Sequence, residues 1–221
     1  MKISYNSIYL LTIVFLSNCN QEKDNVIPTD GETYRINITF NWTESNHTNS
    51  FGDFPNNAHF SPVIGSIHGN NYSFFRTGDL ASPGMKLMAE TGSISTLSSE
   101  IDLQISQGLV YDKFFAQGPA GNNENKFISE VKAYDNFHFL SMVSMIAPSP
   151  DWFIASRNIN LKNEDGTWKD EITLDIHGYD SGTDSGEEFS SINNSTSPVE
   201  EIKRFEGGND IVFAIATITK Q

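Results

Sequence analysis

The stretch Phe137-His138-Phe139-Leu140-Ser141-Met142-Val143-Ser144-Met145-Ile146 is apolar almost throughout, with serines interspersed. Near-continuous apolarity over this length is typical of a strand buried on both faces, so it predicts a central strand of a β-sandwich. The chain then enters Ala147-Pro148-Ser149-Pro150-Asp151-Trp152. Its prolines lack the backbone donors that a strand or a helix interior needs, so this segment predicts a loop at the end of the sheet.

Further strands are predicted on both sides of this one. Between Tyr34 and Trp42 the even positions are apolar and the odd ones mostly polar, and Glu171–Ile176 alternates in the same way. This period of two indicates half-buried antiparallel strands. Extended structure is also expected over residues 109–115, 152–155 and 210–218. At least seven strands with long loops predict an all-β fold, an antiparallel β-sandwich.

Two short helices are expected within the connections. Ser82 as N-cap, Pro83 at the first helical position and Gly92 past the end frame a helix of about two turns. A second helix is predicted from about Ser95 to Gln107 because apolar residues recur on one face. The two helices should pack together as one flank of the sandwich.

A second acidic loop is predicted at Tyr179-Asp180-Ser181-Gly182-Thr183-Asp184-Ser185-Gly186, after the strand at 171–176. If both loops lie at the same end of the sheet, Asp151, Asp180 and Asp184 converge on one spot. Gathered carboxylates repel one another, and a hard cation such as calcium relieves that repulsion. The alternative is that each aspartate caps its own turn through nearby backbone N–H groups.

Composition limits the partners. The 221 residues include 28 Asp and Glu against 14 Lys and Arg, a formal net charge of −14, which argues against nucleic acid and against an anionic bilayer surface. Sixteen Phe, three Trp and seven Tyr supply enough large apolar surface for a core. The length after removal of a leader suits a single domain.

The N-terminus predicts location. Met1-Lys2 is a minimal basic region, Ile8–Leu16 is apolar but far short of the about twenty residues that span a bilayer, and Leu16-Ser17-Asn18-Cys19 resembles the lipobox of bacterial lipoproteins. We therefore expect a lipoprotein signal peptide at 1–18, lipidation of Cys19, a polar tether over 19–31 and the domain at 32–221. The protein would then lie outside the cytoplasm in the cell envelope, at the outer membrane or cell surface, with its lipid as the only membrane contact. The alternative is an ordinary secretory leader with an incidental cysteine.

Three groups of motifs stand in order between Tyr34 and Gly186. They are His59-Phe60-Ser61-Pro62 with Tyr72-Ser73-Phe74-Phe75-Arg76, Leu80-Ala81-Ser82-Pro83-Gly84 and Met88-Ala89-Glu90; then Ser144–Trp152; then Tyr179–Gly186. Together they resemble the N-terminal spondin domain of F-spondin and mindin. The sequence departs from that pattern at Gly178, where proline is common, and in having no cysteine within the domain.

The resemblance implies a C2-like β-sandwich that is extracellular, binds calcium and serves in adhesion or matrix contact. Because all three motif positions match, it also implies that Asp151, Asp180 and Asp184 hold the calcium ion. The partner that it implies is a protein or a glycan of unspecified identity.

Catalysis is the competing hypothesis. The five histidines show no His-x-x-x-His spacing, and no Gly-x-Ser-x-Gly motif is present, although His59 and His177 with a serine such as Ser61 could form a hydrolytic set. A hydrolase that acts on envelope or extracellular polysaccharide through its acidic cleft is the alternative function, and it requires two carboxylates at a defined separation. We expect a binding module rather than an enzyme.

Overall fold

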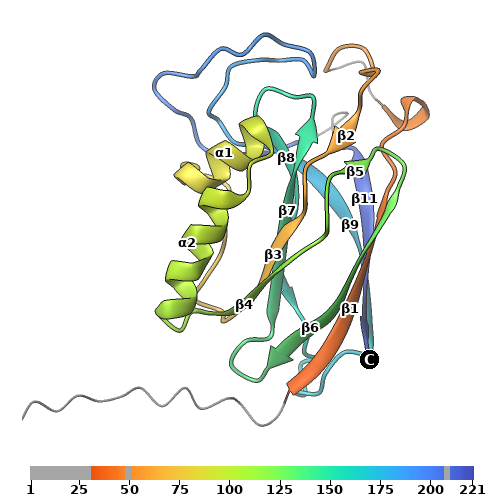
Figure 1. The fold of residues 1–221 in the computed structure, drawn as a ribbon, viewed down its shortest axis with the longest axis vertical. Helices are drawn as coiled ribbons and strands as arrows, with labels where there is room; N and C mark the ends of the chain where they lie inside the picture. Colours follow the sequence, from red (N-terminus) through yellow and green to blue (C-terminus); the bar gives the residue numbers. More distant parts are fainter. Residues whose placement is uncertain (1–30, 48–50, 207–209) are drawn as a thin grey trace, which may run out of the picture.

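The computed structural model describes residues 31–47, 51–206 and 210–221. These residues form eleven strands, two α-helices and one short 3-10 helix, which confirms the all-β class with two inserted helices (Figure 1). The elements are β1 (Gly31–Phe40), η1 (Glu44–Asn46), β2 (His59–Phe60), β3 (Ile64–His68), α1 (Pro83–Thr91), α2 (Ser95–Ser106), β4 (Val110–Phe115), β5 (Ala120–Gly121), β6 (Asn125–Tyr134), β7 (Phe139–Ala147), β8 (Trp152–Asn160), β9 (Glu171–Asp180), β10 (Lys203–Arg204) and β11 (Val212–Lys220).

The strands form one continuous antiparallel sheet in the order β4-β3-β7-β8-β9-β11-β1-β6, with the short β2, β5 and β10 attached beside this path. The sheet folds over on itself, so that its two end strands, β4 and β6, come into contact and the sandwich is almost a closed barrel (Figure 1). Strand β7 pairs with β3 on one side and β8 on the other. The central position predicted for the 137–146 stretch is confirmed.

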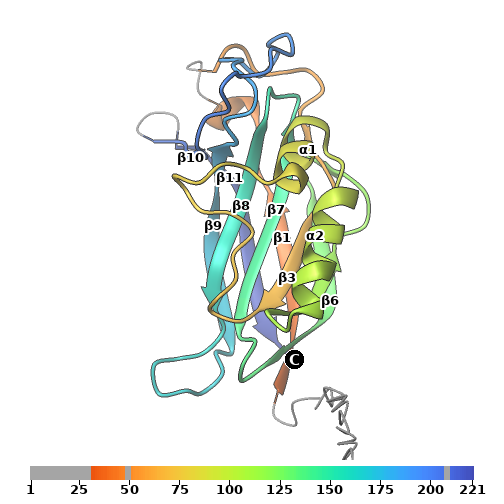
Figure 2. The same ribbon diagram turned by 90° about the vertical axis from the view of Figure 1, so that its left-hand side faces the viewer.

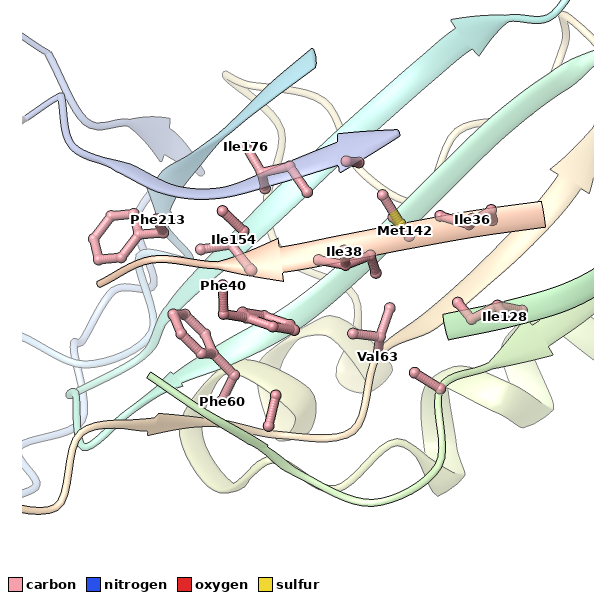
Figure 3. Packing of buried hydrophobic residues seen from close by; sticks show 14 of the residues in the cluster. Ile36, Ile38, Phe40, Phe60, Val63, Ile128, Met142, Ile154, Ile176 and Phe213 are labelled. Carbon is pink, nitrogen blue, oxygen red and sulfur yellow. The ribbon is translucent and has the colours of Figure 1, made fainter. Parts of the chain in front are cut away.

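The main core fills the space inside the folded sheet. On β1 the alternating residues Tyr34, Ile36, Ile38 and Phe40 all point inward and are fully buried. Figure 3 shows Phe40 and Phe60 facing each other inside this core, with ring centroids 4.6 Å apart. Burial of this apolar surface is the main stabilising contribution to the fold.

The helices make a second core on the outer face of the sheet. Their buried side chains, among them Met85, Met88 and Ile101, pack with Val143 and Phe153 from β7 and β8. Figure 2 shows both helices lying over this face. Strand β7 is thus covered on both faces, which explains why its sequence is apolar at nearly every position.

Five strands were not predicted: the two-residue strands β2, β5 and β10, and the longer β3 and β6. The two longer ones each have a physical reason. In β6 the alternation breaks at Glu130, whose positive φ of 60° accompanies a change of register against β1. In β3 every residue is buried, including Gly65 and Ser66. A Cβ at Gly65 would lie 2.2 Å from the ring of Phe114, so glycine is required where that ring crosses the strand.

The second acidic loop also begins later than predicted. Strand β9 runs on to Asp180, because Phe153 and Trp152 of β8 pair with Tyr179 and Asp180, and β10 pairs with the same two residues from the other side. Asp180 is therefore the last residue of a strand and not a loop residue. The predicted signal peptide, Cys19 and the tether up to residue 30 lie outside the described residues. No helix in the described ranges is long and apolar enough to cross a membrane.

Candidate functional site

The two acidic segments lie at the same end of the sheet, as the sequence predicts. Asp151 immediately precedes β8 and Asp180 ends its neighbour β9, so antiparallel pairing brings the two positions together. The backbone N–H of Ser181 donates to the carbonyl oxygen of Asp151 over 3.2 Å. Gly186 packs against the ring of Pro150, and a Cβ there would come within 2.6 Å of the proline. Close backbone approach thus joins the two loops.

Asp151 is the centre of this arrangement. Its side chain is fully buried, and its Oδ2 accepts hydrogen bonds from the Ser181 hydroxyl at 2.9 Å and from the backbone N–H groups of Thr183 at 2.6 Å and Asp184 at 3.0 Å. The Thr183 hydroxyl adds a longer contact of 3.2 Å. One carboxylate oxygen therefore fixes the path of the whole second loop.

The other oxygen of Asp151 is in a different situation. Oδ1 is buried and has no hydrogen-bond partner among the described residues. A buried carboxylate oxygen without a partner is costly, because burial removes the water that would otherwise solvate its charge. The chemistry that suits such an oxygen is a cation or a strong donor.

Asp180 lies beside Asp151 and shares its environment. Its Oδ1 accepts from the backbone N–H of Gly182 at 2.7 Å, which closes a tight turn. Burial, and after it the neighbouring Asp151 carboxylate, raise the pKa of Asp180 to about 6. Two carboxylates that disfavour each other's charge form an electrostatic arrangement that a bound cation would relieve.

Asp184 is held differently. Its Oδ1 accepts from the N–H of Gly186 at 2.8 Å and its Oδ2 from the N–H of Asn194 at 2.7 Å. Asp180 and Asp184 therefore both cap turns, as the alternative hypothesis expects. It is the backbone of Asp184, not its carboxylate, that contacts Asp151.

Calcium remains a prediction for these residues. Within the described ranges, no group of three or more His, Cys, Asp or Glu side chains stands close enough to hold a metal ion in this conformation. The residues nevertheless fit the ion in one respect, because Asp151 Oδ1 is buried and unpartnered beside a second carboxylate. Each carboxylate oxygen has two lone pairs, so one backbone hydrogen bond does not prevent it from binding a cation.

The sequence did not single out Ser181, Thr183 or Asn194, although each holds an aspartate of the site. The Asp-Ser-Gly-Thr-Asp stretch could have indicated this role, since Ser and Thr hydroxyl groups placed between aspartates can donate hydrogen bonds to carboxylates. Gly182 has a φ of +72°, and a Cβ there would lie 2.4 Å from the carbonyl oxygen of Glu200. Glycine is therefore required at this turn.

The residues of the hypothetical hydrolytic set are engaged elsewhere. His59 Nδ1 bonds the carbonyl oxygen of Asn57 at 2.6 Å, and His177 Nδ1 lies 2.7 Å from Asp210. Ser61 Oγ is 3.3 Å from the Ser144 hydroxyl and accepts from the N–H of Met145. In this part of the chain the serine is bonded to β7 and to neither histidine.

This fold and this site define a class of protein: an antiparallel β-sandwich that carries carboxylates on paired loops at one end. The family model described as Spondin_N matches residues 32–210, and the chain belongs to that family.

Individual relatives agree with this assignment. The chain is 35% identical over 174 residues to Spondin-1 of Gallus gallus and 34% identical over the same length to Spondin-1 of Homo sapiens, in each case covering 77% of this chain and 21% of the relative. It is 30% identical over 169 residues to Spondin-2 of Rattus norvegicus, covering 76% of this chain and 51% of the relative. The chain thus matches about a fifth of Spondin-1 and about half of Spondin-2.

Proposed function

We propose that this protein is a calcium-stabilised adhesion or ligand-binding module, held outside the cytoplasm by a lipid on Cys19. Membership of the Spondin_N family supports an extracellular binding role, and the lipobox-like Leu16–Cys19 supports the anchor. The partner is a glycan or a protein that the loop end or an outer face of the sandwich contacts, and no nucleic acid is involved.

One observation carries the calcium part of the proposal: the buried Oδ1 of Asp151 has no hydrogen-bond partner and lies beside the Asp180 carboxylate. Calcium takes about six to eight oxygen ligands. Asp151 and Asp180 would supply the first carboxylates, and Asp184 would join through lone pairs that its two backbone donors leave free. Backbone carbonyls and water would complete the shell.

When bound, calcium neutralises the charge that Asp151 and Asp180 place at the end of β8 and β9. The residues of this chain do the rest: Ser181 and the N–H groups of Thr183 and Asp184 hold the Asp151 carboxylate in place. The ion therefore links two strand ends that are already paired. Its effect should be to stiffen the loops rather than to create the fold.

Calcium titration of the purified full-length protein tests this proposal. At a calcium concentration about a hundredfold above Kd, binding should add about 2.7 kcal/mol to the free energy of unfolding. A rise in Tm of roughly 5–10 °C is expected for a domain of this size. The Asp180→Asn and Asp184→Asn variants should lose most of that rise and should bind calcium more weakly by isothermal titration calorimetry.

The matched control is Asp112→Asn, because Asp112 is an exposed aspartate on β4, away from the acidic loops. This variant should keep the full calcium response. If Asp180→Asn and Asp184→Asn respond to calcium as the wild type does, the metal site is not at these residues. Metabolic labelling with a radioactive fatty acid would separately test the anchor, since the wild-type protein should incorporate the label and the Cys19→Ser variant should carry none.

A further inference from the structure

A groove of about 660 Å³ lies on the outer face of the sheet, where β8, β9 and β10 run side by side. The connection from β3 to α1 crosses in front of this face (Figure 2). Pockets of roughly 300–1,000 Å³ are the size that takes a small organic ligand or a short oligosaccharide. The groove uses none of the three aspartates assigned to calcium.

Arg157 supplies the groove with an available positive charge. Its guanidinium lies 5.4 Å from the centroid of the Phe75 ring and donates to the Phe75 carbonyl oxygen at 3.4 Å. These contacts fix the plane of the guanidinium before any ligand arrives. No carboxylate within the described residues forms an ion pair with Arg157, although the chain as a whole carries a charge of −14.

The other two cations of the groove are already paired. Lys203 lies 2.7 Å from Glu200, and Arg204 lies 3.2 Å from Asp210. One cation is therefore left to receive an anionic group. A planar guanidinium receives a carboxylate through two parallel hydrogen bonds, which is the strongest such pairing available to a protein.

An aromatic ring lies next to that cation. Tyr179 lines the groove, and its ring is stacked on Phe153 at 5.5 Å and meets Phe75 edge to face at 5.1 Å. Because these contacts hold the ring in one orientation, it costs little entropy to use it as a surface for a ligand. A partly exposed tyrosine beside an arginine suits a ligand whose ring presents C–H groups to Tyr179 and a carboxylate to Arg157.

Two exposed carboxylates, Glu201 and Glu206, also line the groove. They would repel a ligand that carries more than one charge per unit, such as a highly sulfated polysaccharide. They would accept hydrogen bonds from hydroxyl groups, however, because an ionised carboxylate has only acceptors. The ligand that satisfies all of these groups has one carboxylate per ring and several hydroxyls.

We propose that this groove binds a uronic-acid-containing saccharide, with the carboxylate of one sugar on Arg157, the ring against Tyr179 and hydroxyls on Glu201 and Glu206. The inference rests on the proposed binding function and names the ligand class for it. It is independent of the calcium site, so calcium titration in the absence of saccharide tests that site separately. If the protein binds calcium but no saccharide, the saccharide proposal fails and the calcium proposal stands.

The experiment is isothermal titration calorimetry of the full-length protein, at constant calcium, with trigalacturonate and with its methyl ester. The ester has the same rings without the charge. The free acid should bind at least about tenfold more tightly, since a hydrogen bond to a charged group contributes about 1.5–3 kcal/mol. Arg157→Gln should lose about 10- to 100-fold in affinity for the free acid and nothing for the ester.

Two further variants keep the test decisive. Arg157→Lys retains the charge and the aliphatic stem but not the two parallel donors, so it should bind with an affinity between those of the wild type and Arg157→Gln. Arg35→Gln makes the same charge change at an exposed position on β1 and should leave binding unchanged. Thermal melts establish that each variant is folded.

Three results would overturn the proposal. Equal affinity for the acid and the ester would mean that no carboxylate is recognised. Unchanged binding in both folded Arg157 variants would place the ligand elsewhere. Binding of a triglutamate peptide as tight as that of trigalacturonate would show an acidic-peptide site in place of a saccharide site.

Discussion

The ring of Phe205 lies directly against the backbone of Gly178 on β9. A Cβ at residue 178 would stand 2.4 Å from Cδ2 of Phe205 and 2.9 Å from Cε2 of Phe213. Phe205 is buried, and its N–H donates to the Gly178 carbonyl oxygen at 3.0 Å. Strand β9 is therefore held by the Phe205 ring at Gly178, two residues before Asp180. Only glycine leaves space for the ring at that position.

We expect Gly178→Ala to destabilise the fold by about 1–3 kcal/mol, because the added methyl group forces a well-packed core apart. Urea denaturation followed by tryptophan fluorescence measures this. Gly121→Ala is the control, since its Cβ would meet no atom closer than 3.4 Å. A loss of stability in Gly178→Ala no larger than that of the control would contradict the packing argument.

Asp151 should be a structural residue even in the absence of calcium. Asp151→Ala removes the acceptor for the Ser181 hydroxyl and for the N–H groups of Thr183 and Asp184, all of them buried. Leaving one such group unsatisfied costs about 1–3 kcal/mol, so in EGTA we expect a loss of at least about 3 kcal/mol. Urea denaturation in EGTA gives the value.

The comparison for this variant is Ser181→Ala, which removes only one of those donors. Its cost should be about 1 kcal/mol. If Asp151→Ala costs no more than Ser181→Ala, then the hydrogen bonds to Asp151 Oδ2 do not determine the path of the loop, and the residue acts through a bound ion alone.

The stability of the calcium-free protein should depend on pH through the protonation of Asp180. Because its pKa is raised from 3.8 to about 6, the folded state binds a proton more readily than the unfolded state between these values. Stability contributed by this group therefore rises as pH falls from about 7 towards 4, by at most about 3 kcal/mol. Asp180→Asn resembles the protonated form and should lack this contribution.

Thermal melts in EGTA from pH 7 to pH 4.5 measure the difference in Tm between the wild type and Asp180→Asn. The variant should be the more stable at pH 7, and the gap should narrow as the pH falls through about 6. Added calcium should reverse the trend for the wild type, since protons then compete with the ion. A gap that does not change with pH would rule out a raised pKa at Asp180.

The meeting of the two acidic segments was predictable from sequence because it depends only on strand ends. A buried run up to Ile146 and an alternating run from Glu171 end next to carboxylates, and antiparallel neighbours share an edge of the sheet. The roles of individual oxygen atoms were not predictable. Asp151 Oδ2 and Asp184 Oδ1 each accept a hydrogen bond from a backbone N–H group, and the positions of these N–H groups are set only when the loop has folded.

The groove was not predictable for a related reason. Arg157 comes from β8, Tyr179 from β9 and Glu201 from the segment before β10, so no local pattern joins them. Strand β6 was missed because the bulge at Glu130 breaks the alternation that identifies a strand. Sequence periodicity therefore located the core and the loop ends, whereas sites built from side chains of separate strands required the fold.

The last prediction concerns the contact between α2 and the N-terminus of α1. Glu100 of α2 accepts from the N–H of Gly84 at 2.7 Å and from the Ser82 hydroxyl at 2.7 Å, and Ser82 in turn accepts from the N–H of Met85 at 3.1 Å. A negative charge from one helix thus completes the N-terminal cap of the other. Because free N–H groups at a helix N-terminus favour an anion, Glu100→Ala should cost about 1–2 kcal/mol, and Glu100→Gln about half as much.

Hydrogen exchange separates this local effect from a general loss of stability. In Glu100→Ala the amides of Gly84 and Met85 should exchange much faster, whereas the amide of Leu140, a buried residue of β7, should change only as far as global stability does. Glu90→Ala is the control, because Glu90 lies on α1 and its carboxylate pairs with Lys86 at 3.6 Å, not with the backbone N–H groups at the start of the helix. Equal protection of Gly84 in the two variants would show that Glu100 does not cap the helix.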